Sequence, residues 1–311
     1  MLNVIQLMDD EGLGHCKRMV TFAKLISKTG DKIVFLISDK KKYQAKVLDH
    51  EDLEFIEYDY SLGVDHTYSL VIKKRCNPNL RSWSIDTKRN CIETLKFIKD
   101  QGVYTRLFDN SAPCRLLADE NIYPTPLFDR GDLDWSNYKG KVLGGWEQVL
   151  LGEKIRSLKL IYDKTKRKNC VISFGGSDPQ NLTLKTMELL SIHVDEVPIV
   201  VIVGANFRNT TNIFNFNEKI GNKFKLVIEP KNIDDYIASA KLLFTAVGLT
   251  IVEAIFLGIS TVCISNHFED KRDLERLKRF KNVFVFGDFK KLSYREQILL
   301  QVFRDTYGLP Q

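Results

Sequence analysis

Short apolar runs alternate with helical stretches along nearly the whole chain, and this alternation limits the fold more than any other feature. The runs include NVIQLM at residues 3–8, KIVFLIS at residues 32–38 and CVISFGG at residues 170–176. Each is followed by a segment in which apolar residues recur at helical spacing. Strands that alternate with helices in this way form parallel sheets with helices on both faces. The sequence therefore predicts an α/β fold with doubly wound sheets.

The alternation is interrupted once, between residues 130 and 168, where Gly, Trp and Lys are frequent and KVLGG is the only clear strand. A chain of 311 residues also exceeds the usual span of one hydrophobic core. We therefore expect two Rossmann-like domains, at residues 1–145 and 169–311, joined by a linker at residues 146–168. The expected strands are at residues 3–8, 32–38, 53–60, 82–86, 104–109, 141–145, 170–176, 198–204, 224–230, 242–248, 260–265 and 282–288. The expected helices are at residues 16–28, 88–99, 182–191, 233–240, 250–257, 271–280 and 294–304, with a further Lys-rich helix after residue 38.

The charge balance is mildly basic, with 46 Lys and Arg against 40 Asp and Glu, a net charge of +6. Two basic clusters, DKKKYQAK and DKTKRKN, are interleaved with polar residues and carry no stripe of aromatic side chains. We therefore expect solvated faces and no nucleic-acid partner. The balance suits a small anionic ligand, and it is compatible with peripheral contact with an anionic membrane surface. The sequence leaves the oligomeric state open.

Several classes of protein are not expected. No apolar run approaches the roughly 18 residues of a membrane span, and MLNVIQLMDDEG has no features of a signal peptide, so we expect a cytoplasmic protein. The six cysteines include no C-x-x-C pair, and the histidines form no H-E-x-x-H motif. We therefore expect neither a disulfide framework nor a metal site, and we expect no cofactor.

Three glycine-containing loops follow expected strands and precede expected helices. They read DDEGLGHC at residues 9–16, FGGSDPQNLT at residues 174–183 and AVGLTIVEA at residues 246–254. Such a loop directs backbone N–H groups and a helix N-terminus toward a ligand, and both favour an anion such as phosphate. One loop alone is also typical of an ordinary tight turn, but three of them favour a phosphate-bearing ligand. None is a Walker loop, because no G-K-[ST] follows.

His15 is the candidate for chemistry. A helix N-terminus disfavours an imidazolium, so His15 at this position should stay neutral and able to accept a proton. The alternative is a histidine that only makes a hydrogen bond at the start of the helix. Arg18, one turn on, could hold an anion or pair with Asp9 or Asp10. Gly14 leaves room for a ligand near the backbone.

Two carboxylates have two interpretations each. Glu253 follows Gly248 and is expected in the first turn of a helix, where it either complements the helix dipole or accepts the hydroxyls of a ribose. Asp86 ends an expected strand and is either a site residue or the cap of the next helix.

Together, these motifs resemble one enzyme family. The G-x-G-H-x-x-R motif of Gly12, Gly14, His15 and Arg18, the segment SFGGSDPQNLTLK and the segment GLTIVEAIFLGIS are similar to the UDP-sugar hydrolases of the pseudaminic acid pathway. Those enzymes release a diacetamido trideoxy sugar from UDP. Their wider relatives are nucleotide-sugar glycosyltransferases of the GT-B fold, including the MurG-like enzyme of peptidoglycan synthesis. The resemblance spans most of the chain and implies two Rossmann-like domains facing a cleft.

The resemblance also implies residue roles. His15 would be the general base that activates water, in the N-terminal domain, and Gly14 would let the sugar or diphosphate approach. The C-terminal domain would bind the UDP-sugar, and it would need no metal. There Glu253 would hold the ribose, and backbone near residues 228–233 the uracil. The remaining implied contacts to the diphosphate and sugar are Gly175, Gly176, Ser177, Gly248, Leu249 and Thr250.

The sequence departs from the hydrolase pattern at three places. Thr87 follows Asp86 where the family has a histidine, Gly152 replaces a larger residue, and the loop SNHFEDKRD has no glutamine. Three functions therefore stay open: a nucleotide-sugar hydrolase, which the resemblance favours, a glycosyltransferase with the same donor site, and a protein that only binds a nucleotide-sugar.

Overall fold

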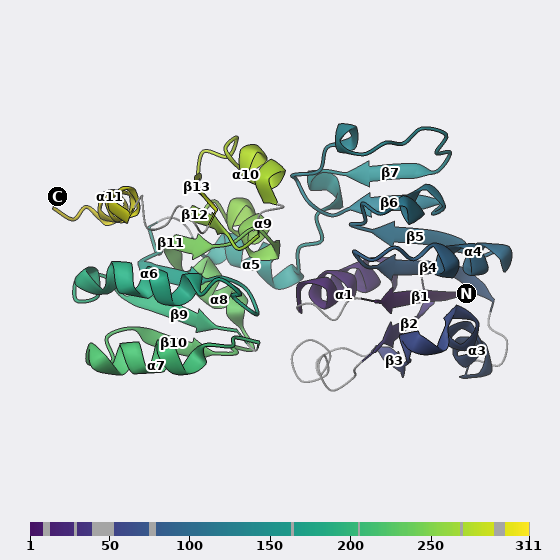
Figure 1. Cartoon of the computed structure of the whole chain (residues 1–311), viewed down its shortest axis with the longest axis horizontal. Coiled ribbons are helices and arrows are strands. Elements are labelled where there is room, and N and C mark those ends of the chain that lie inside the picture. The colour runs from purple at the N-terminus through teal and green to yellow at the C-terminus, as the bar shows by residue number, and fades with distance from the viewer. Residues whose placement is uncertain are drawn as a thin grey trace. The chain divides into compact units, whose positions relative to one another are not determined.

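The computed structural model describes residues 1–8, 13–27, 30–38, 53–74, 79–162, 165–204, 206–267, 270–288 and 296–310. The chain divides into two compact units, Met1–Gly152 and Glu153–Gln311. Each unit is built on one parallel sheet, and each is described by itself (Figure 1). The expected α/β fold with two doubly wound sheets is confirmed.

The first unit holds a seven-stranded sheet in the order β3-β2-β1-β4-β5-β6-β7. All of its strand pairs are parallel. Its strands are β1 (Leu2–Leu7), β2 (Lys32–Ile37), β3 (Glu54–Glu57), β4 (Leu80–Asp86), β5 (Tyr104–Phe108), β6 (Glu120–Tyr123) and β7 (Lys141–Gly144). Its helices are α1 (Leu13–Ser27), η2 (Tyr60–Leu62), α3 (Val64–Lys74), α4 (Ile92–Asp100), η3 (Pro113–Leu116), η4 (Arg130–Asp132) and η5 (Trp146–Gln148).

The strand order fixes where a ligand can enter this sheet. The chain builds outward from β1 to β3 on one side and from β4 to β7 on the other. The connections that leave β1 and β4 therefore diverge, and a crevice opens at the carboxyl ends of these two neighbouring strands. Leu7 and Asp86, the last residues of β1 and β4, lie opposite each other in register at this edge.

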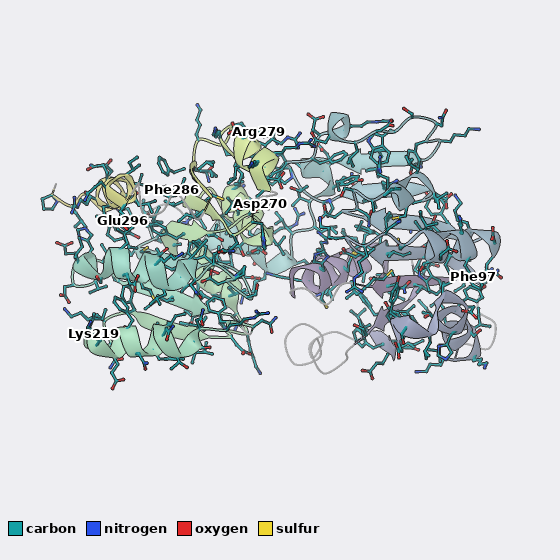
Figure 2. All side chains as sticks on the ribbon, in the orientation of Figure 1. Phe97, Lys219, Asp270, Arg279, Phe286 and Glu296 are labelled. Carbon is teal, nitrogen blue, oxygen red and sulfur yellow. The ribbon has the colours of Figure 1, made fainter. Side chains whose placement is uncertain are left out.

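Apolar side chains from the helices cover the sheet of the first unit. Tyr68 of α3 stacks on the fully buried Trp83 of β4 with ring centroids 6.0 Å apart, and it meets the ring of Phe97 of α4 edge-on at 5.5 Å. Figure 2 labels Phe97 at this helix. The buried Trp83 satisfies its indole N–H by donating to Gln6 Oε1 at 2.8 Å, which removes the cost of burying a polar group.

The second unit repeats the plan with a six-stranded sheet in the order β10-β9-β8-β11-β12-β13, again parallel throughout. Its strands are β8 (Asn169–Ser173), β9 (Ile199–Val203), β10 (Lys225–Ile228), β11 (Ala240–Thr245), β12 (Ser260–Ser265) and β13 (Val283–Asp288). Its helices are α5 (Glu153–Ile161), α6 (Leu182–Leu190), η6 (Ser191–His193), α7 (Thr210–Lys219), α8 (Ile233–Ala238), α9 (Leu249–Leu257), α10 (Lys271–Leu277) and α11 (Glu296–Tyr307).

The strand order of the second sheet places its crevice at the carboxyl ends of β8 and β11, where Ser173 lies opposite Thr245. The core beneath is apolar: Phe303 of α11 is fully buried in the same cluster as Phe244 of β11 and Phe286 of β13. Figure 2 labels Phe286. This packing holds the two strand ends that carry the glycine loops.

Most expected elements are present, with shifts at their ends. The helix expected at residues 88–99 begins only at Ile92, after a turn that follows β4. Neither β6 nor the helices α3 and α7 was expected. The Lys-rich helix expected after residue 38 lies outside the described residues. The stretch expected as a linker, residues 146–168, includes η5 and α5, and α5 packs against α8 and α9 of the second unit.

One glycine of the second unit is required by packing. A Cβ built on Gly204, just after β9, would lie 2.6 Å from the backbone oxygens of both Gly175 and Gly176. Asn206 donates its backbone N–H to the same Gly176 oxygen at 2.9 Å. The loop after β8 is therefore held against the chain that leaves β9, and only a residue without a side chain fits at 204.

We predict that Gly204→Ala lowers the free energy of unfolding by about 1–3 kcal/mol, because the added methyl group must push a backbone segment aside. Gly176→Ala is the matched control, since a Cβ there meets no atom within 4 Å. Urea unfolding measures both variants. Equal free energies of unfolding for the two variants would show that the backbone at Gly175 and Gly176 leaves room for a Cβ at position 204.

Candidate active site

Three side chains of the first unit meet at the carboxyl edge of its sheet. His15 lies in the first turn of α1, which follows β1. Asp86 is the last residue of β4, and Asp109 comes directly after β5. Because β1, β4 and β5 are neighbours in the sheet, residues far apart in the sequence are brought to one place. This place is the crevice that the strand order defines.

His15 is held by a buried carboxylate. Its Nδ1 lies 2.8 Å from Asp86 Oδ1, and the Asp86 side chain has no exposed surface, whereas that of His15 is 22% exposed. Asp86 therefore contacts the candidate histidine, and the alternative that it caps the next helix is wrong, because Cys91 is the N-cap of α4. Asp86 thus fixes the imidazole on its buried side, while the exposed part of the ring is accessible to a ligand or water.

Arg18 balances the charge of Asp86. Its Nε and Nη2 donate to the two Asp86 oxygens at 2.6 and 2.5 Å, in the two-pronged geometry that makes arginine–carboxylate pairs strong. Burial alone would raise the pKa of Asp86, but the charge and hydrogen bonds of Arg18, with the bond from His15, lower it. Asp86 is therefore ionised at neutral pH.

The charge of Asp86 decides which nitrogen of His15 carries the proton. His15 Nδ1 lies 2.8 Å from Asp86 Oδ1 and 3.1 Å from Arg18 Nη2. The carboxylate makes the shorter contact and can only accept hydrogen bonds, so we assign the proton of the neutral ring to Nδ1. Nε2 is then the free base, and it has no hydrogen-bond partner among the described residues. A histidine oriented by a carboxylate, with the other nitrogen open, can take a proton from a water or a hydroxyl group.

Two carboxylates already occupy the guanidinium of Arg18, as in the alternative that it pairs with aspartates, and its contact with a ligand anion stays a prediction. Its Nη1 donates to Asp109 Oδ2 at 2.9 Å, and the side chain is only 13% exposed. The same Asp109 oxygen lies 2.7 Å from Lys88 Nζ. Asp9 and Asp10, the partners expected for Arg18, lie outside the described residues, as does Gly12.

Sequence reasoning missed Asp109 and Lys88. The signal was present, because Asp109 ends the run YTRLFD just as Asp86 ends SWSID, and carboxyl ends of adjacent parallel strands share an edge. Burial would raise the pKa of Asp109, but the positive charges of Lys88 and Arg18 lower it to about 2. Its left-handed backbone, with φ 52°, turns the chain sharply after β5.

The second unit brings two of the glycine loops to one edge. Gly175, Gly176 and Ser177 are exposed and follow β8, while Gly248 follows β11, the neighbouring strand. No atom lies within 4 Å of a Cβ built on Gly175, Gly176 or Gly248, and the same holds for Gly14 in the first unit. Space beside these four backbones is therefore open.

The two helix N-termini at this edge differ. Asp178 accepts the backbone N–H groups of Leu182 at 2.9 Å and Thr183 at 2.8 Å, so a carboxylate already occupies the start of α6. The expectation that α6 offers its N-terminus to a phosphate is therefore wrong. α9 begins at Leu249 and Thr250 with Gly248 as its N-cap, and no side chain of the described residues caps it. Its N–H groups are the donors that remain for an anion.

Glu253 occupies the second turn of α9 and not the first, so the interpretation as a dipole-stabilising residue is not supported. Its side chain is buried, with 2% exposed. The contact with a ribose stays a prediction.

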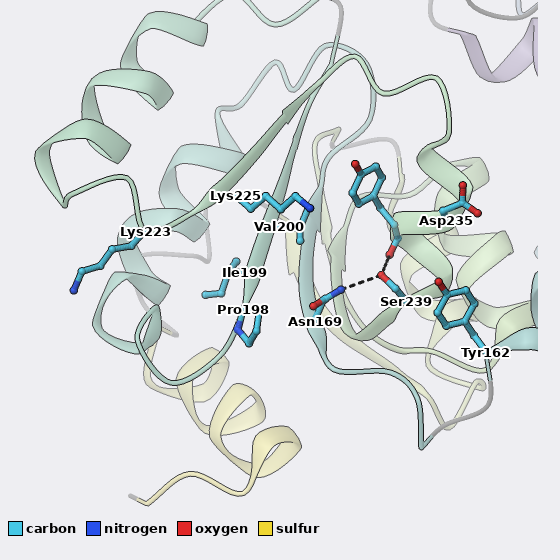
Figure 3. Close-up of a pocket in the computed structure, with 10 residues that line it drawn as sticks. Tyr162, Asn169, Pro198, Ile199, Val200, Lys223, Lys225, Asp235 and Ser239 are labelled. Atoms are coloured by element: carbon cyan, nitrogen blue, oxygen red, sulfur yellow. Dashed lines mark hydrogen bonds between the residues drawn. The ribbon is translucent and has the colours of Figure 1, made fainter.

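A separate pocket of about 510 Å³ lies in the second unit at the opposite edge of its sheet (Figure 3). It is lined by the first residues of three strands, Asn169 of β8, Ile199 of β9 and Lys225 of β10. Asn169 donates to Ser239 Oγ at 3.2 Å across its wall. Because both glycine loops follow carboxyl ends of strands, this pocket is not part of the candidate site.

Within the described ranges, no group of three or more His, Cys, Asp and Glu side chains is placed to hold a metal ion. The helices of those ranges include none with the length and apolarity to cross a membrane.

Comparison with known proteins identifies the fold. No protein-family model matches the chain. An uncharacterized protein of Methanocaldococcus jannaschii is 36% identical over 115 residues, which are 36% of this chain and 24% of that protein. The chain thus spans about a quarter of the length of this curated relative.

Solved structures match nearly the whole chain. MurG of Acinetobacter baumannii has a TM-score of 0.60 and 12% identity, covering 98% of this chain and 90% of its own. The spinosyn rhamnosyltransferase SpnG, complexed with thymidine diphosphate, has a TM-score of 0.60 and 10% identity, covering 99% and 92%. A putative UDP-N-acetylglucosamine 2-epimerase of Listeria monocytogenes has a TM-score of 0.58 and 11% identity, covering 98% and 89%. The chain therefore has the GT-B fold of two Rossmann-like units.

We predict that Arg18→Met lowers the free energy of unfolding by about 3 kcal/mol or more, because it leaves the buried charge of Asp86 unbalanced. Adding Asp86→Asn should recover part of the loss, since the buried charge is then gone. Arg81→Met is the matched control: Arg81 pairs with Asp31 at 2.6 Å but is 49% exposed, so its loss should stay below about 1 kcal/mol. Urea unfolding measures all three, and equal losses for Arg18→Met and Arg81→Met would contradict the account.

A pH dependence follows from Asp109. Its pKa is about 2 in the folded protein, so the unfolded chain, with an ordinary aspartate pKa of about 4, takes up the proton first as the pH falls. The stability that Asp109 contributes is therefore complete above about pH 5 and is lost between about pH 4 and pH 2. We predict that Asp109→Asn is less stable than the parent at pH 7 and that the gap narrows at pH 3. A gap of constant size in thermal unfolding would rule this out.

Proposed function

We propose that this chain hydrolyses a UDP-linked deoxyamino sugar at the anomeric carbon, releasing UDP and the free sugar for biosynthesis of a surface glycan of the nonulosonic acid type. The observation that carries the proposal is the His15–Asp86 pair at the crevice of the first sheet, with Nε2 of His15 left open. The pseudaminic acid pathway hydrolases, which the G-x-G-H-x-x-R motif resembles, supply the reaction type and the substrate class.

The pair would act as the general base in a single displacement, after which His15 returns its proton to the solvent. His15 Nε2 takes a proton from a water molecule while the water oxygen forms a bond to the anomeric carbon. The bond between that carbon and the phosphate oxygen breaks, and its electron pair leaves with the diphosphate. Asp86 stabilises the imidazolium that forms, because its charge lies 2.8 Å from Nδ1. His15 is the catalytic residue, and Asp86 and Arg18 position it.

The second unit offers donors for the nucleotide. The uncapped backbone N–H groups at the start of α9, from Leu249 and Thr250, would bind the diphosphate and stabilise its charge as it leaves. The open backbone at Gly175, Gly176 and Ser177 would line the diphosphate and sugar, and Gly14 would leave room for the sugar. Glu253 would hold the ribose. Structures of the same fold include one complexed with thymidine diphosphate, which supports a nucleotide ligand.

Transfer to a hydroxyl acceptor is the second candidate. MurG and the spinosyn rhamnosyltransferase are transferases by name and share the fold, and the same histidine could take the proton of an acceptor hydroxyl. The resemblance of the motif to a hydrolase favours water. The resemblance also implies a reaction that needs no metal. A protein that binds a nucleotide-sugar without turnover would not need a histidine oriented for proton transfer.

The test is UDP release from purified protein and a panel of UDP-linked amino sugars, with EDTA present and no acceptor added. We expect UDP and free sugar in equal amounts. Binding of UDP with no release in any panel member would contradict hydrolysis, and release that starts only when a cell extract supplies an acceptor would establish transfer.

We predict that His15→Asn lowers turnover by about 10²–10⁴-fold, the usual contribution of a general base, while UDP binding measured by calorimetry is unchanged. His66→Asn is the matched control, because His66 is an exposed histidine of α3 in the same unit and has no place in the site. Full activity of His15→Asn would remove His15 from the mechanism.

A further inference from the structure

Two cysteines of the first unit lie side by side, in the turns that follow the two aspartates of the candidate site. Cys91 precedes α4 as its N-cap, five residues after Asp86, and Cys114 lies in η3, five residues after Asp109. Their sulfur atoms are 3.6 Å apart, and both side chains are buried, with 2% and 0% exposed. The pair thus joins the turn that follows β4 to the turn that follows β5.

We propose that Cys91 and Cys114 are a reversible oxidation site, at which a peroxide converts the two thiols to a disulfide that links the turns carrying Asp86 and Asp109. The sulfur atoms need to approach from 3.6 Å to about 2.05 Å, the length of a disulfide bond.

Cys114 is the sulfur that reacts first. The hydrogen bond with Cys91 is the main cause that lowers the pKa of Cys114 to about 7, so part of it is thiolate at neutral pH. Cys170 and Cys263 differ, because burial raises the pKa of each far above its usual range. Reactivity toward a peroxide follows thiolate character, and among these three thiols only Cys114 has it.

The chemistry balances with hydrogen peroxide as the oxidant. The Cys114 thiolate attacks one peroxide oxygen, forms a sulfenic acid and releases hydroxide. The Cys91 sulfur then attacks the Cys114 sulfur, the S–O bond breaks, and the hydroxyl leaves with the Cys91 proton as water. Two thiols lose two electrons, and the peroxide gains them to form two water molecules.

A pocket lies at the start of α4, beside Cys91. A pocket of about 240 Å³ is lined by Cys91 and its neighbours Asn90 and Ile92, with Tyr60, Glu93 and Thr94 completing the wall. The volume is several times that of a water molecule, which is about 30 Å³. Peroxide can therefore approach from the side of Cys91, and Cys114 Sγ lies 3.6 Å beyond Cys91 Sγ.

The pair is coupled to the active site through Asn110. The Asn110 amide donates to the backbone oxygens of Thr87 at 2.6 Å and Arg89 at 2.8 Å, so it already ties the two turns together. Cys114 Sγ lies 3.5 Å from Asn110 Oδ1. Movement of Cys114 toward Cys91 therefore displaces Asn110, the residue that follows Asp109. Asp109 in turn contacts Lys88 and Arg18.

The consequence for turnover rests on the proposed function. A displacement of about 1 Å at a catalytic group costs up to about a hundredfold in rate. We predict that the oxidised protein turns over the sugar nucleotide at least about tenfold more slowly than the reduced protein, and that dithiothreitol restores the rate.

The experiment treats the folded full-length protein with hydrogen peroxide, blocks free thiols after denaturation, and digests with trypsin. We expect peptide 90–96 joined to peptide 107–115, lost on treatment with dithiothreitol, while Cys170 and Cys263 stay reduced. Cys263→Ser is the matched control and should form the same link. Cys91→Ser should leave Cys114 as a sulfenic acid that dimedone traps.

Each outcome decides one claim. If both thiols of the pair remain free in the folded protein, or if the peptides join only in unfolded protein, the inference is wrong, whatever the enzyme does. If the link forms and turnover is unchanged, the coupling to the site is wrong. If the link forms in a protein with no turnover in either state, the oxidation site stands and the proposed function fails. Cys91→Ser and Cys114→Ser should both turn over at the rate of the reduced parent protein, and peroxide should not slow either variant, because neither can form the link.

Discussion

The buried charge of Asp86 is the constraint on which the first unit depends. A carboxylate with no exposed surface is stable only when hydrogen bonds and an opposite charge replace the water it has lost. Arg18 supplies both, and His15 supplies a further hydrogen bond. His15 and Arg18 lie one turn apart on the same face of α1. Because both contact Asp86 at the end of β4, this one carboxylate holds that face of the helix at the crevice. The same charge selects the tautomer of His15.

The two sheets share the same topology, but the groups at their crevices differ. Each has one place where its connections diverge, between β1 and β4 in the first and between β8 and β11 in the second. The first places charged side chains there, and the second places exposed backbone. Within the second, Asp178 closes the start of α6, whereas the start of α9 is uncapped. This difference concentrates the remaining anion donors at Leu249 and Thr250.

The sequence alone predicts an element correctly where residues within that element determine its structure. Apolar runs such as PIVVIVG bury both faces of a parallel strand, so their positions follow from composition alone. β6 was missed because ENIY is short and half polar, and it is a strand only because β5 and β7 pair with it. The site shows the same division. Local sequence motifs identify His15 and the glycine loops. The partners of Arg18, however, are 68 and 91 residues away in the sequence, and only the strand order brings them near.

The central claim is that water attacks the anomeric carbon, and hydrolysis in water labelled with heavy oxygen tests it most directly. The measurement is the mass of both products at early times, before the free sugar exchanges its anomeric oxygen with solvent. The account predicts the label in the released sugar and none in UDP, because the bond that breaks is the one between carbon and the phosphate oxygen. Label in the terminal phosphate of UDP would mean that water attacks phosphorus, and it would contradict the account.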